Sequence, residues 1–262
     1  MNSIIYERDP LLLRGHRVEI VEVNETNVDK SDICCARSKL CGEQNKKEWL
    51  KRRFSEGLKL KLLRIDDMSW GVIEYLPSEF GWRPINAPGF MLINCLRIIG
   101  KYRKMGFGSL LLNECIQDSK KMNGIVTLER NIIVTGSSKF FNKKGFQIYD
   151  SAFGLNLLAI KFKKSQSPSF FENAKKGIIP KQKGLTLVYS NQCPYIESHI
   201  AELRELADFY NIKVTEIQLK NREQSQNCYS PFDAFSMFYN GKFLLHGLNK
   251  RKLALFLEDL QN

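Results

Sequence analysis

The chain has 262 residues, 43% of them hydrophobic, which is enough for one large or two medium-sized domains with real cores. Its 40 lysines and arginines against 28 aspartates and glutamates give a net charge of +12, which suits an anionic ligand, an acidic substrate or nucleic acid, and equally a solvated lysine-rich surface. Seven cysteines, an odd number at irregular spacing, exclude a disulfide framework and favour a reduced, cytoplasmic protein.

Three of the cysteines, Cys34, Cys35 and Cys41, lie close together near the N-terminus. No matching pair of cysteines or histidines follows them at the spacing of a zinc site, so we expect no metal. The N-terminus has no long apolar stretch, and no run long enough to cross a membrane occurs elsewhere. We therefore expect a protein without a membrane segment.

The first part of the chain alternates strand and helix patterns. The expected elements are a strand at 18–23, a polar turn at 24–32 leading into a short helix through Cys34 and Cys35, a helix at 46–58 with a basic face, and strands at 59–65 and 70–76. Residues 77–89 contain three prolines and two glycines and are predicted to be a loop. Trp82 and Arg83 in this loop either line a substrate pocket or pack over a sheet edge.

A strand at 93–99, a loop with two glycines and a helix at 109–122 follow. A glycine loop that enters a helix N-terminus predicts an anion site, because free backbone N–H groups and the helix dipole point at the ligand and no Cβ blocks its approach. The next expected elements are a strand at 124–129, a helix at 135–144 ended by Gly145, and strands at 146–150 and 155–162.

At this loop the chain resembles the acetyltransferases of the GNAT superfamily, whose acetyl-CoA loop reads Arg/Gln-x-x-Gly-x-Gly/Ala and matches Arg103 to Gly108. A second GNAT pattern, Ala-x-x-Leu-Tyr-x-x-x-Gly-Phe, keeps its spacing at residues 137–146 and ends in Gly145 and Phe146. The resemblance covers about residues 16–164 and implies a mixed α/β sheet. It also implies acetyl-CoA as co-substrate, held by Leu96, Arg97, Ile98, Arg103, Lys104, Met105, Gly106, Phe107, Gly108, Ser109 and Phe141.

The second pattern also carries a departure from the family. The tyrosine that in many members returns a proton to the CoA thiolate is Phe141 here, and a phenyl ring cannot donate a proton. Val134 takes the place of an upstream asparagine. In the implied chemistry a neutral amine attacks the thioester directly. Glu74 and Glu129 are the candidate general bases, each with the alternative of being an ordinary strand carboxylate, and Asn94 is a candidate for orienting substrate or water.

Residues 165–183 are rich in Lys, Ser, Pro and Gly and are predicted to link a domain at 1–164 to a second domain at 184–262, with Phe170 and Phe171 as a docking patch. The second domain is expected to contain strands at 185–189, 214–219, 234–239 and 242–246 and helices at 196–210 and 251–260. Asn240 and Gly241 are a hairpin signal between the last two strands.

This order resembles a small thioredoxin or glutaredoxin domain, in which Cys193-Pro194-Tyr195 would begin the active-site motif. The resemblance implies a thiol site at Cys193 beside a cis peptide bond at Ser230-Pro231. Pro194 is favoured in the first turn of a helix, so Cys193 is expected at a helix N-terminus, where its pKa would be lowered. The usual second cysteine is Ile196, which excludes a dithiol cycle within the motif, although Cys228 could resolve an oxidised Cys193.

Together the two resemblances look like the YoaP-like acetyltransferase group. The function this implies is acetyl-CoA-dependent acylation of an unidentified amine, on a small molecule or a protein, by a monomer or a homodimer. Two alternatives remain at this point: a thiol-redox or thiol-binding protein that acts through Cys193, and a noncatalytic module that binds CoA or nucleic acid. No basic motif interleaved with aromatic residues supports nucleic acid.

Overall fold

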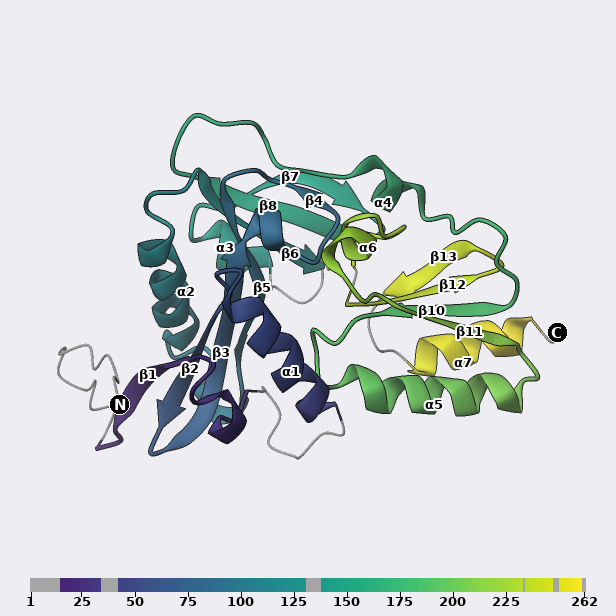
Figure 1. The fold of residues 1–262 in the computed structure, drawn as a ribbon, viewed down its shortest axis with the longest axis horizontal. Coiled ribbons are helices and arrows are strands. Elements are labelled where there is room, and N and C mark those ends of the chain that lie inside the picture. Colours follow the sequence, from purple (N-terminus) through teal and green to yellow (C-terminus); the bar gives the residue numbers. More distant parts are fainter. Residues whose placement is uncertain (1–14, 34–41, 131–137, 233, 247–249, 261–262) are drawn as a thin grey trace.

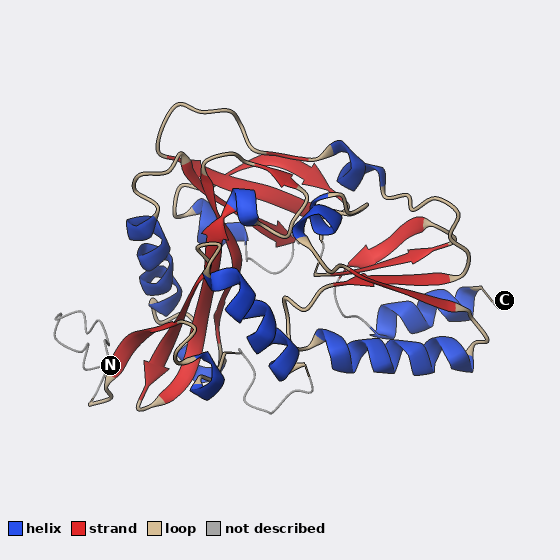
Figure 2. Cartoon of the chain, viewed as in Figure 1, coloured by secondary structure: helices blue, strands red, loops and turns tan. Residues whose placement is uncertain are grey.

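The computed structural model describes residues 15–33, 42–130, 138–232, 234–246 and 250–260. Within these ranges a seven-stranded sheet and a four-stranded sheet lie side by side, each with its own helices (Figure 1). Figure 2 shows that helices separate the two sheets over part of their boundary and that loops meet over the rest. No described helix has the length and apolar character needed to cross a membrane.

The larger sheet has the order β1-β2-β3-β5-β6-β8-β7, and only the β5–β6 pair is parallel. Its strands are β1 (Val18–Val23), β2 (Lys59–Ile65), β3 (Met68–Pro77), β5 (Phe90–Ile98), β6 (Gly124–Arg130), β7 (Gln147–Ala152) and β8 (Leu155–Lys161). Asp66 and Asp67 form the β2–β3 turn with positive φ angles of 49° and 64°. The mixed α/β sheet and the strand positions predicted in this half of the chain are confirmed.

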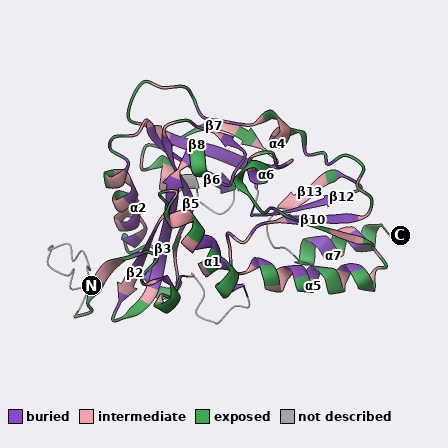
Figure 3. Ribbon diagram, in the orientation of Figure 1, coloured by how far each residue is buried: buried purple, intermediate pink, exposed green. Residues whose placement is uncertain are grey.

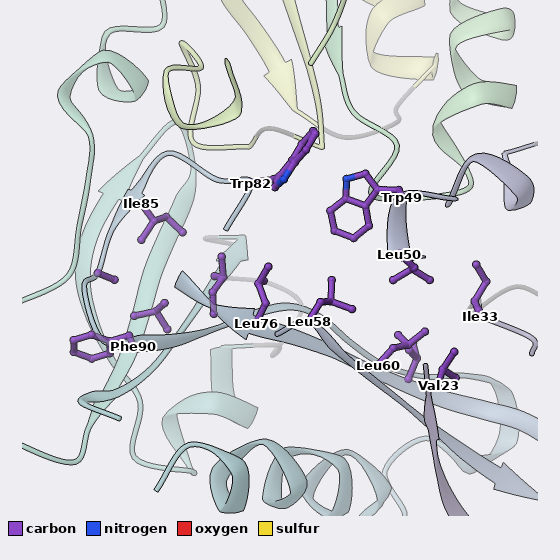
Figure 4. Packing of buried hydrophobic residues seen from close by; sticks show 14 of the residues in the cluster. Val23, Ile33, Trp49, Leu50, Leu58, Leu60, Leu76, Trp82, Ile85 and Phe90 are labelled. Atoms are coloured by element: carbon purple, nitrogen blue, oxygen red, sulfur yellow. The ribbon is translucent and has the colours of Figure 1, made fainter. Parts of the chain in front are cut away.

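Helices cover both faces of the larger sheet. On one face α1 (Glu43–Phe54) packs Trp49 and Leu50 into a buried cluster with strand residues, and Figure 4 shows the two tryptophans Trp49 and Trp82 together at one edge of this cluster. On the other face lie α2 (Phe107–Asp118) and α3 (Ser138–Asn142) (Figure 1). Three short 3₁₀ helices, Val28–Lys30, Ser78–Phe80 and Gly100–Tyr102, lie in the connections. The strands at the centre of the sheet are the most buried elements (Figure 3).

A buried polar network fixes α2 to the sheet. The hydroxyl of Tyr75 donates to Asp118 at 2.6 Å, and the ammonium of Lys61 lies 2.9 Å from Glu114 and 3.2 Å from Asp118. Burial and the hydrogen bond to Asp118 both raise the pKa of Tyr75. Burial alone would raise the pKa of Asp118, but hydrogen bonds from Lys59 and Tyr75 outweigh it and lower that pKa. The network holds the C-terminal half of α2, which fixes where its N-terminus lies relative to β5.

The smaller sheet has the order β11-β10-β12-β13, with β10 and β11 parallel and the other pairs antiparallel. Its elements are β10 (Leu185–Tyr189), α5 (Ile196–Phe209), β11 (Val214–Gln218), α6 (Arg222–Gln226), β12 (Phe235–Tyr239), β13 (Lys242–His246) and α7 (Lys250–Asp259). Helices α5 and α7 share one face of this sheet (Figure 1). Asn240 and Gly241, with φ of 47° and 76°, turn β12 into β13 as the sequence predicts.

The structure changes several sequence expectations. Helix α1 begins at Glu43 rather than Lys46, and α5 begins at Ile196, so Cys193 lies in the preceding turn and not at the start of the helix. No cis peptide bond occurs among the described residues, so the expected cis bond before Pro231 is wrong. The short α6 in the polar stretch 221–229 was not predicted. The expected helix through Cys34 and Cys35, Cys41, and the motif positions Val134 and Ser137 lie outside the described residues.

Residues 165–183, predicted as a linker, contain two short elements. Strand β9 (Ser169–Phe170) pairs with β4 (Ile85–Asn86) from the loop at 77–89, and α4 (Glu172–Lys176) follows. Phe170 is 2% exposed and packs into the α1-side cluster, whereas Phe171 is only partly buried. Phe170 therefore docks this segment against the larger sheet.

Candidate active site

The larger sheet splits between its two parallel strands. Strands β5 and β6 pair only from Phe90 to Ile93 on one side and Gly124 to Thr127 on the other. Beyond this point β5 stays paired to β3 and β6 to β8, so the two strands part. The hydroxyl of Thr127 donates to the carbonyl oxygen of Ile93 at 3.2 Å at the vertex. The backbone edges that face each other across the split can pair with an extended ligand.

A bulge lies on β5 where the split begins. Glu74 of β3 pairs with Cys95, whereas the next residue, Tyr75, pairs with Ile93. Asn94 is therefore an extra residue in β5, which is the definition of a β-bulge. Bulges bend a strand and redirect its side chains, so this bulge turns β5 away from β6 and sets the position of Asn94.

The glycine loop follows β5 and enters α2. Gly106 precedes the helix with φ of 90°, and Lys104 has φ of 63°, so the backbone turns twice through the left-handed region. Open space surrounds the position a Cβ would take on Gly106. Arg103, Lys104, Met105 and Gly106 are exposed, whereas Phe107 is buried and anchors the helix. The N–H groups of Ser109 and Leu110 donate to the carbonyl oxygen of Gly106, whereas those of Phe107 and Gly108 precede the first of these bonds and can face an anion.

The predicted CoA-binding residues on β5 and α3 converge on the α2 side of the sheet. Leu96, Ile98 and Phe141 pack against the cluster that contains Phe107. The ring of Phe141 lies 5.1 Å from that of Phe146. Gly108 faces this group, because a Cβ there would lie 3.5 Å from the ring of Phe140. Arg97 is exposed on the opposite side of β5, so the structure does not bring it into this group.

On the other face of the sheet, the predicted catalytic residues Glu74 and Asn94 are in contact. The side-chain amide of Asn94 donates to Oε1 of Glu74 at 3.0 Å. Oε2 of Glu74 accepts from the ammonium of Lys46 at 2.5 Å, and the two ion-paired side chains are 3% and 5% exposed. Lys46 also lies 4.2 Å from the centre of the Trp49 ring. The carboxylate is thus fixed from two directions, and each oxygen keeps a lone pair for another donor.

Arg83 holds the bulge from the other side. Its Nη2 donates to the carbonyl oxygen of Asn94 at 3.1 Å, and its Nε donates to Oδ1 of Asn94 at 3.4 Å. Arg83 is 6% exposed although it belongs to the loop between β3 and β5. Arg83 thus contacts Asn94 and Trp82 packs into the α1-side cluster, whereas a role of this loop in lining a substrate pocket stays a prediction.

Glu129, the other candidate base, lies apart from this group. It is 8% exposed and lies on β6 after the point where β5 and β6 part, and there it pairs with Asn156 of β8. Leu128 packs into the α1-side cluster, so strand alternation directs Glu129 to the α2 side, opposite to Glu74. The structure therefore brings together Glu74 and Asn94 but not Glu129.

Cys193 lines a cavity of about 380 Å³ between the start of α1 and the smaller sheet with α5. The cavity is bounded by Gly42, Asn45, Tyr189, Asn191, Cys193, Ile196, Glu197, Ile200, Ala201, Arg204, Glu216 and Gln218. Cys193 is partly exposed, whereas Cys228 is 3% exposed and packs on the other face of the smaller sheet. The two cysteines therefore belong to the clusters on opposite faces of the smaller sheet.

Sequence reasoning missed Lys46 as a site residue. It assigned Lys46 to the basic face of a helix, where lysines are normally solvated. The signal that could have identified it was its spacing from Trp49, since residues three apart share a helix face and a tryptophan is usually largely buried. Lys46 is in fact 3% exposed.

Comparison of the sequence with known proteins shows the family to which the chain belongs. The chain is 35% identical over 235 residues to YoaP of Bacillus subtilis (strain 168), named as an uncharacterized N-acetyltransferase, and the match covers 86% of this chain and 92% of that protein. The model of the family described as YoaP-like matches residues 214–252. The chain belongs to the YoaP-like N-acetyltransferases. It is therefore an acyltransferase.

Solved acetyltransferase structures align with part of this chain at low sequence identity. An acetyltransferase from Thermus thermophilus aligns with a TM-score of 0.43 and 12% identity over 55% of this chain and 97% of its own. A GNAT family acetyltransferase from Elizabethkingia anophelis with acetyl-CoA bound aligns with a TM-score of 0.40 and 17% identity over 55% of this chain and 98% of its own. Each match spans slightly more than half of this YoaP-like chain.

Proposed function

We propose that this protein transfers the acetyl group of acetyl-CoA to an amine that enters on the α1 side of the larger sheet, and that Glu74 and Asn94 receive that amine. The observation that carries the proposal is the split between β5 and β6, with the glycine loop on one side of the sheet and the Glu74–Asn94 pair on the other. A thioester carbonyl within the split would be open to attack from the α1 face.

The donor half of the site would hold acetyl-CoA. Residues Arg103 to Ser109 would bind the pyrophosphate through backbone N–H groups at the start of α2, aided by the exposed charges of Arg103 and Lys104. The backbone of Leu96 to Ile98 would hold the pantetheine arm along the open edge of β5. Support comes from the unpaired stretch of β5 towards β6 and from the open space around Gly106.

The acceptor half would position the amine. In the reaction the amine nitrogen forms a bond to the acetyl carbon, the carbon–sulfur bond breaks, and CoA leaves as a thiolate. A carboxylate oxygen of Glu74 would accept the proton that the nitrogen loses, and the carbonyl of the acetyl group would take a hydrogen bond from backbone N–H groups beside the bulge. Phe141 has no proton to give, so the thiolate would be protonated from solvent.

We further propose that the C-terminal domain is thioredoxin-like. Its order β10-α5-β11 with a parallel strand pair, followed by the antiparallel β12-β13 pair and α7, supports this assignment. Cys193 would then occupy the place of the motif thiol and serve substrate recognition rather than acetyl transfer, because its cavity lies between the start of α1 and the smaller sheet and has no lining residue from β5 or β6.

The test is CoA thiol release with acetyl-CoA and a panel of amines: spermidine, an α-acetylated lysine amide, a peptide with a free N-terminus and an aminoglycoside. We expect release to depend on at least one amine, to fall at least a hundredfold in Glu74→Gln, and to change less than threefold in Glu129→Gln. These two variants make the same chemical change in buried strand carboxylates on opposite faces. Equal losses in both, or no amine-dependent release in the wild type, would contradict the proposal.

A further inference from the structure

Three consecutive residues of the loop between β3 and β5 are held by side chains of the C-terminal domain. The amide of Gln226 donates to the carbonyl oxygen of Gly81 at 3.1 Å. The amide of Gln192 donates to the carbonyl oxygen of Trp82 at 3.3 Å, and Gln192 is 8% exposed. A loop would normally be free to move, and these contacts fix its backbone from outside the larger sheet.

The third contact is on the side chain of Arg83. Its guanidinium carbon lies 5.7 Å from the centre of the Phe232 ring, within the range of a cation–π contact. Phe232 belongs to the segment between α6 and β12 and packs against the core of the C-terminal domain. One part of the guanidinium thus rests near this ring while another part donates to Asn94.

The helix turn that carries the second cation of the site, Lys46, also contacts the C-terminal domain. Lys46 lies in the first turn of α1. The amide of Asn45 donates to Glu197 of α5 at 2.8 Å. A Cβ on Gly42 would clash with the carbonyl oxygen of Pro194, so the start of α1 packs directly against the turn that contains Cys193.

We infer that the C-terminal domain is a positioning part of the acetyltransferase site. It acts through Phe232 on the Arg83 side chain, through Gln192 on the backbone of the preceding Trp82, and through Arg83 on the Asn94 bulge. Neither residue needs to touch substrate. The inference rests on the proposed roles of Glu74 and Asn94, because only then does the position of the bulge determine acetyl transfer.

The physical reason lies in the length of the arginine side chain. Ordering such a side chain costs rotamer entropy. The Phe232 ring and the fixed backbone of residues 81 and 82 offset this cost, so Arg83 can hold the carbonyl of a bulged residue in one orientation. Without the ring the guanidinium has other rotamers available, and the bulge loses its partner for part of the time.

Hydrogen exchange tests the inference on the full-length chain. We expect Phe232→Leu, which keeps an apolar side chain but removes the ring, to speed exchange in a peptide spanning residues 90–98 at least threefold. A peptide spanning 59–65, on β2, should be unchanged. Phe232→Tyr keeps the ring and should restore wild-type exchange. Phe209→Leu is the matched control, because Phe209 is a phenylalanine of the same domain that is 78% exposed.

Kinetics with the best amine of the panel supply the second readout. We expect Phe232→Leu to lower kcat/KM for the amine about tenfold while KM for acetyl-CoA stays within twofold, because Arg83 does not contact the glycine loop that would hold the pyrophosphate, and the β5 backbone beyond the bulge stays paired to β3. Gln192→Met should show the same split with a smaller loss, and it replaces Phe232→Leu if that variant does not fold. If Phe232 and Gln192 only stabilised the fold, the KM for the amine and the KM for acetyl-CoA would both change or would both stay the same.

The outcomes separate this inference from the proposed function. Unchanged exchange at 90–98 in Phe232→Leu and in Gln192→Met would overturn the inference even if acetyl transfer is proved. Faster exchange at 90–98 with unchanged amine kinetics would overturn it as well, since the bulge would then move without affecting transfer. If no amine is acetylated by the wild type, the proposed function fails, and faster exchange would support only the contact from the C-terminal domain to the bulge.

Discussion

The ammonium of Lys46 lies 2.5 Å from a carboxylate oxygen of Glu74, and almost no solvent reaches either side chain. Two charges are removed from water only at a large desolvation cost, and their attraction offsets that cost when further groups satisfy both partners. Here Asn94 donates to the other oxygen of Glu74, and the Trp49 ring lies beside the ammonium. The pair is therefore costly to break and fixes α1 to β3 in the middle of the site.

Lys46→Met should destabilise the protein by about 3–5 kcal/mol, because it leaves a buried carboxylate without its cation. Adding Glu74→Gln should recover at least half of this loss, since a neutral amide can still accept from Asn94. The measurement is urea unfolding monitored by tryptophan fluorescence, which reports on α1 through Trp49. Lys47→Met is the control, because the neighbouring Lys47 pairs with Glu43 across one helical turn nearer to solvent. Losses of equal size at the two lysines would show that burial of the pair is unimportant.

Gly106→Ala should weaken acetyl-CoA binding at least tenfold. An alanine at φ of 90° is strained by about 1–2 kcal/mol, and the loop can relieve the strain only by changing the backbone that faces the pyrophosphate. Binding of CoA by calorimetry is the measurement. Gly154→Ala is the control, because Gly154 also has a positive φ, 73°, and also has open space where a Cβ would lie, but it is in the β7–β8 turn. CoA affinity that falls equally in both variants would point to a general loss of stability.

Gly108→Ala separates strain from ligand contact in the same loop. Gly108 lacks a positive φ, and an added Cβ would make ordinary van der Waals contact with Phe140 at 3.5 Å. The fold should therefore accept alanine with a change in stability below about 1 kcal/mol, while CoA binding weakens because the Cβ enters the path of the ligand. Thermal unfolding and calorimetry on the same sample check the two halves. Unchanged CoA affinity would remove Gly108 from the binding site.

The sequence predicted most of the larger sheet because its signals were local. Alternating strands such as Val18–Val23, the Asp66-Asp67 turn and the glycine loop each follow from a few neighbouring residues. Burial of Lys46 and Arg83 could not be predicted in this way, because their partners lie 28 and 11 residues away. The bulge at Asn94 could not be predicted either, since it is a shift in the pairing register between β3 and β5. The site therefore depends on long-range pairings that one strand or helix pattern does not encode.

Phe141→Tyr restores the hydroxyl that the family pattern has at this position. The ring packs against Phe146 and next to Phe140, each 5.1 Å away between ring centres, at the α2 side of the split. If the thiolate leaves without a protein acid, turnover should rise or stay unchanged, because the added hydroxyl can only assist protonation of the thiolate. The measurement is kcat with the best amine. A large fall in kcat with unchanged thermal stability would show that the site needs an apolar wall here.

Cys193 should be alkylated by iodoacetamide faster than Cys115 or Cys228. It is partly exposed at a cavity, whereas Cys115 and Cys228 are buried, and burial raises the pKa of Cys115 to about 12. Peptide mass spectrometry at neutral pH measures the three rates in one sample, with Cys115 as internal reference. Cys193→Ser should keep kcat within threefold, since the thiol lies outside the split. Slow alkylation of Cys193, or a collapse of kcat in Cys193→Ser, would contradict these assignments.

The stability of the protein should fall as pH decreases from about 6.5 to about 4, in part because of His246. Burial, together with the positive charge of Arg130, lowers the pKa of His246 from its ordinary value of 6.5 to about 4. Its ring lies 5.5 Å from that of Phe232, so a proton on His246 would place a second cation beside the ring that faces Arg83.

The sign follows from proton binding in the two states. Between these pH values the unfolded chain takes up a proton that the folded chain does not, so unfolding is favoured as pH falls. The contribution is fully present above pH 6.5 and is lost progressively below it. The whole shift corresponds to about 3 kcal/mol, which solvent at this partly exposed ring reduces to about 1–2 kcal/mol.

His246→Gln cannot titrate and should therefore flatten the loss of stability over this window by that amount. The urea midpoint measured at intervals from pH 8 to pH 4 gives both curves. The difference in stability between variant and wild type should be constant above pH 7 and should shrink, or change sign, towards pH 4. Parallel curves over the whole range would show that His246 does not titrate differently in the folded and unfolded chains.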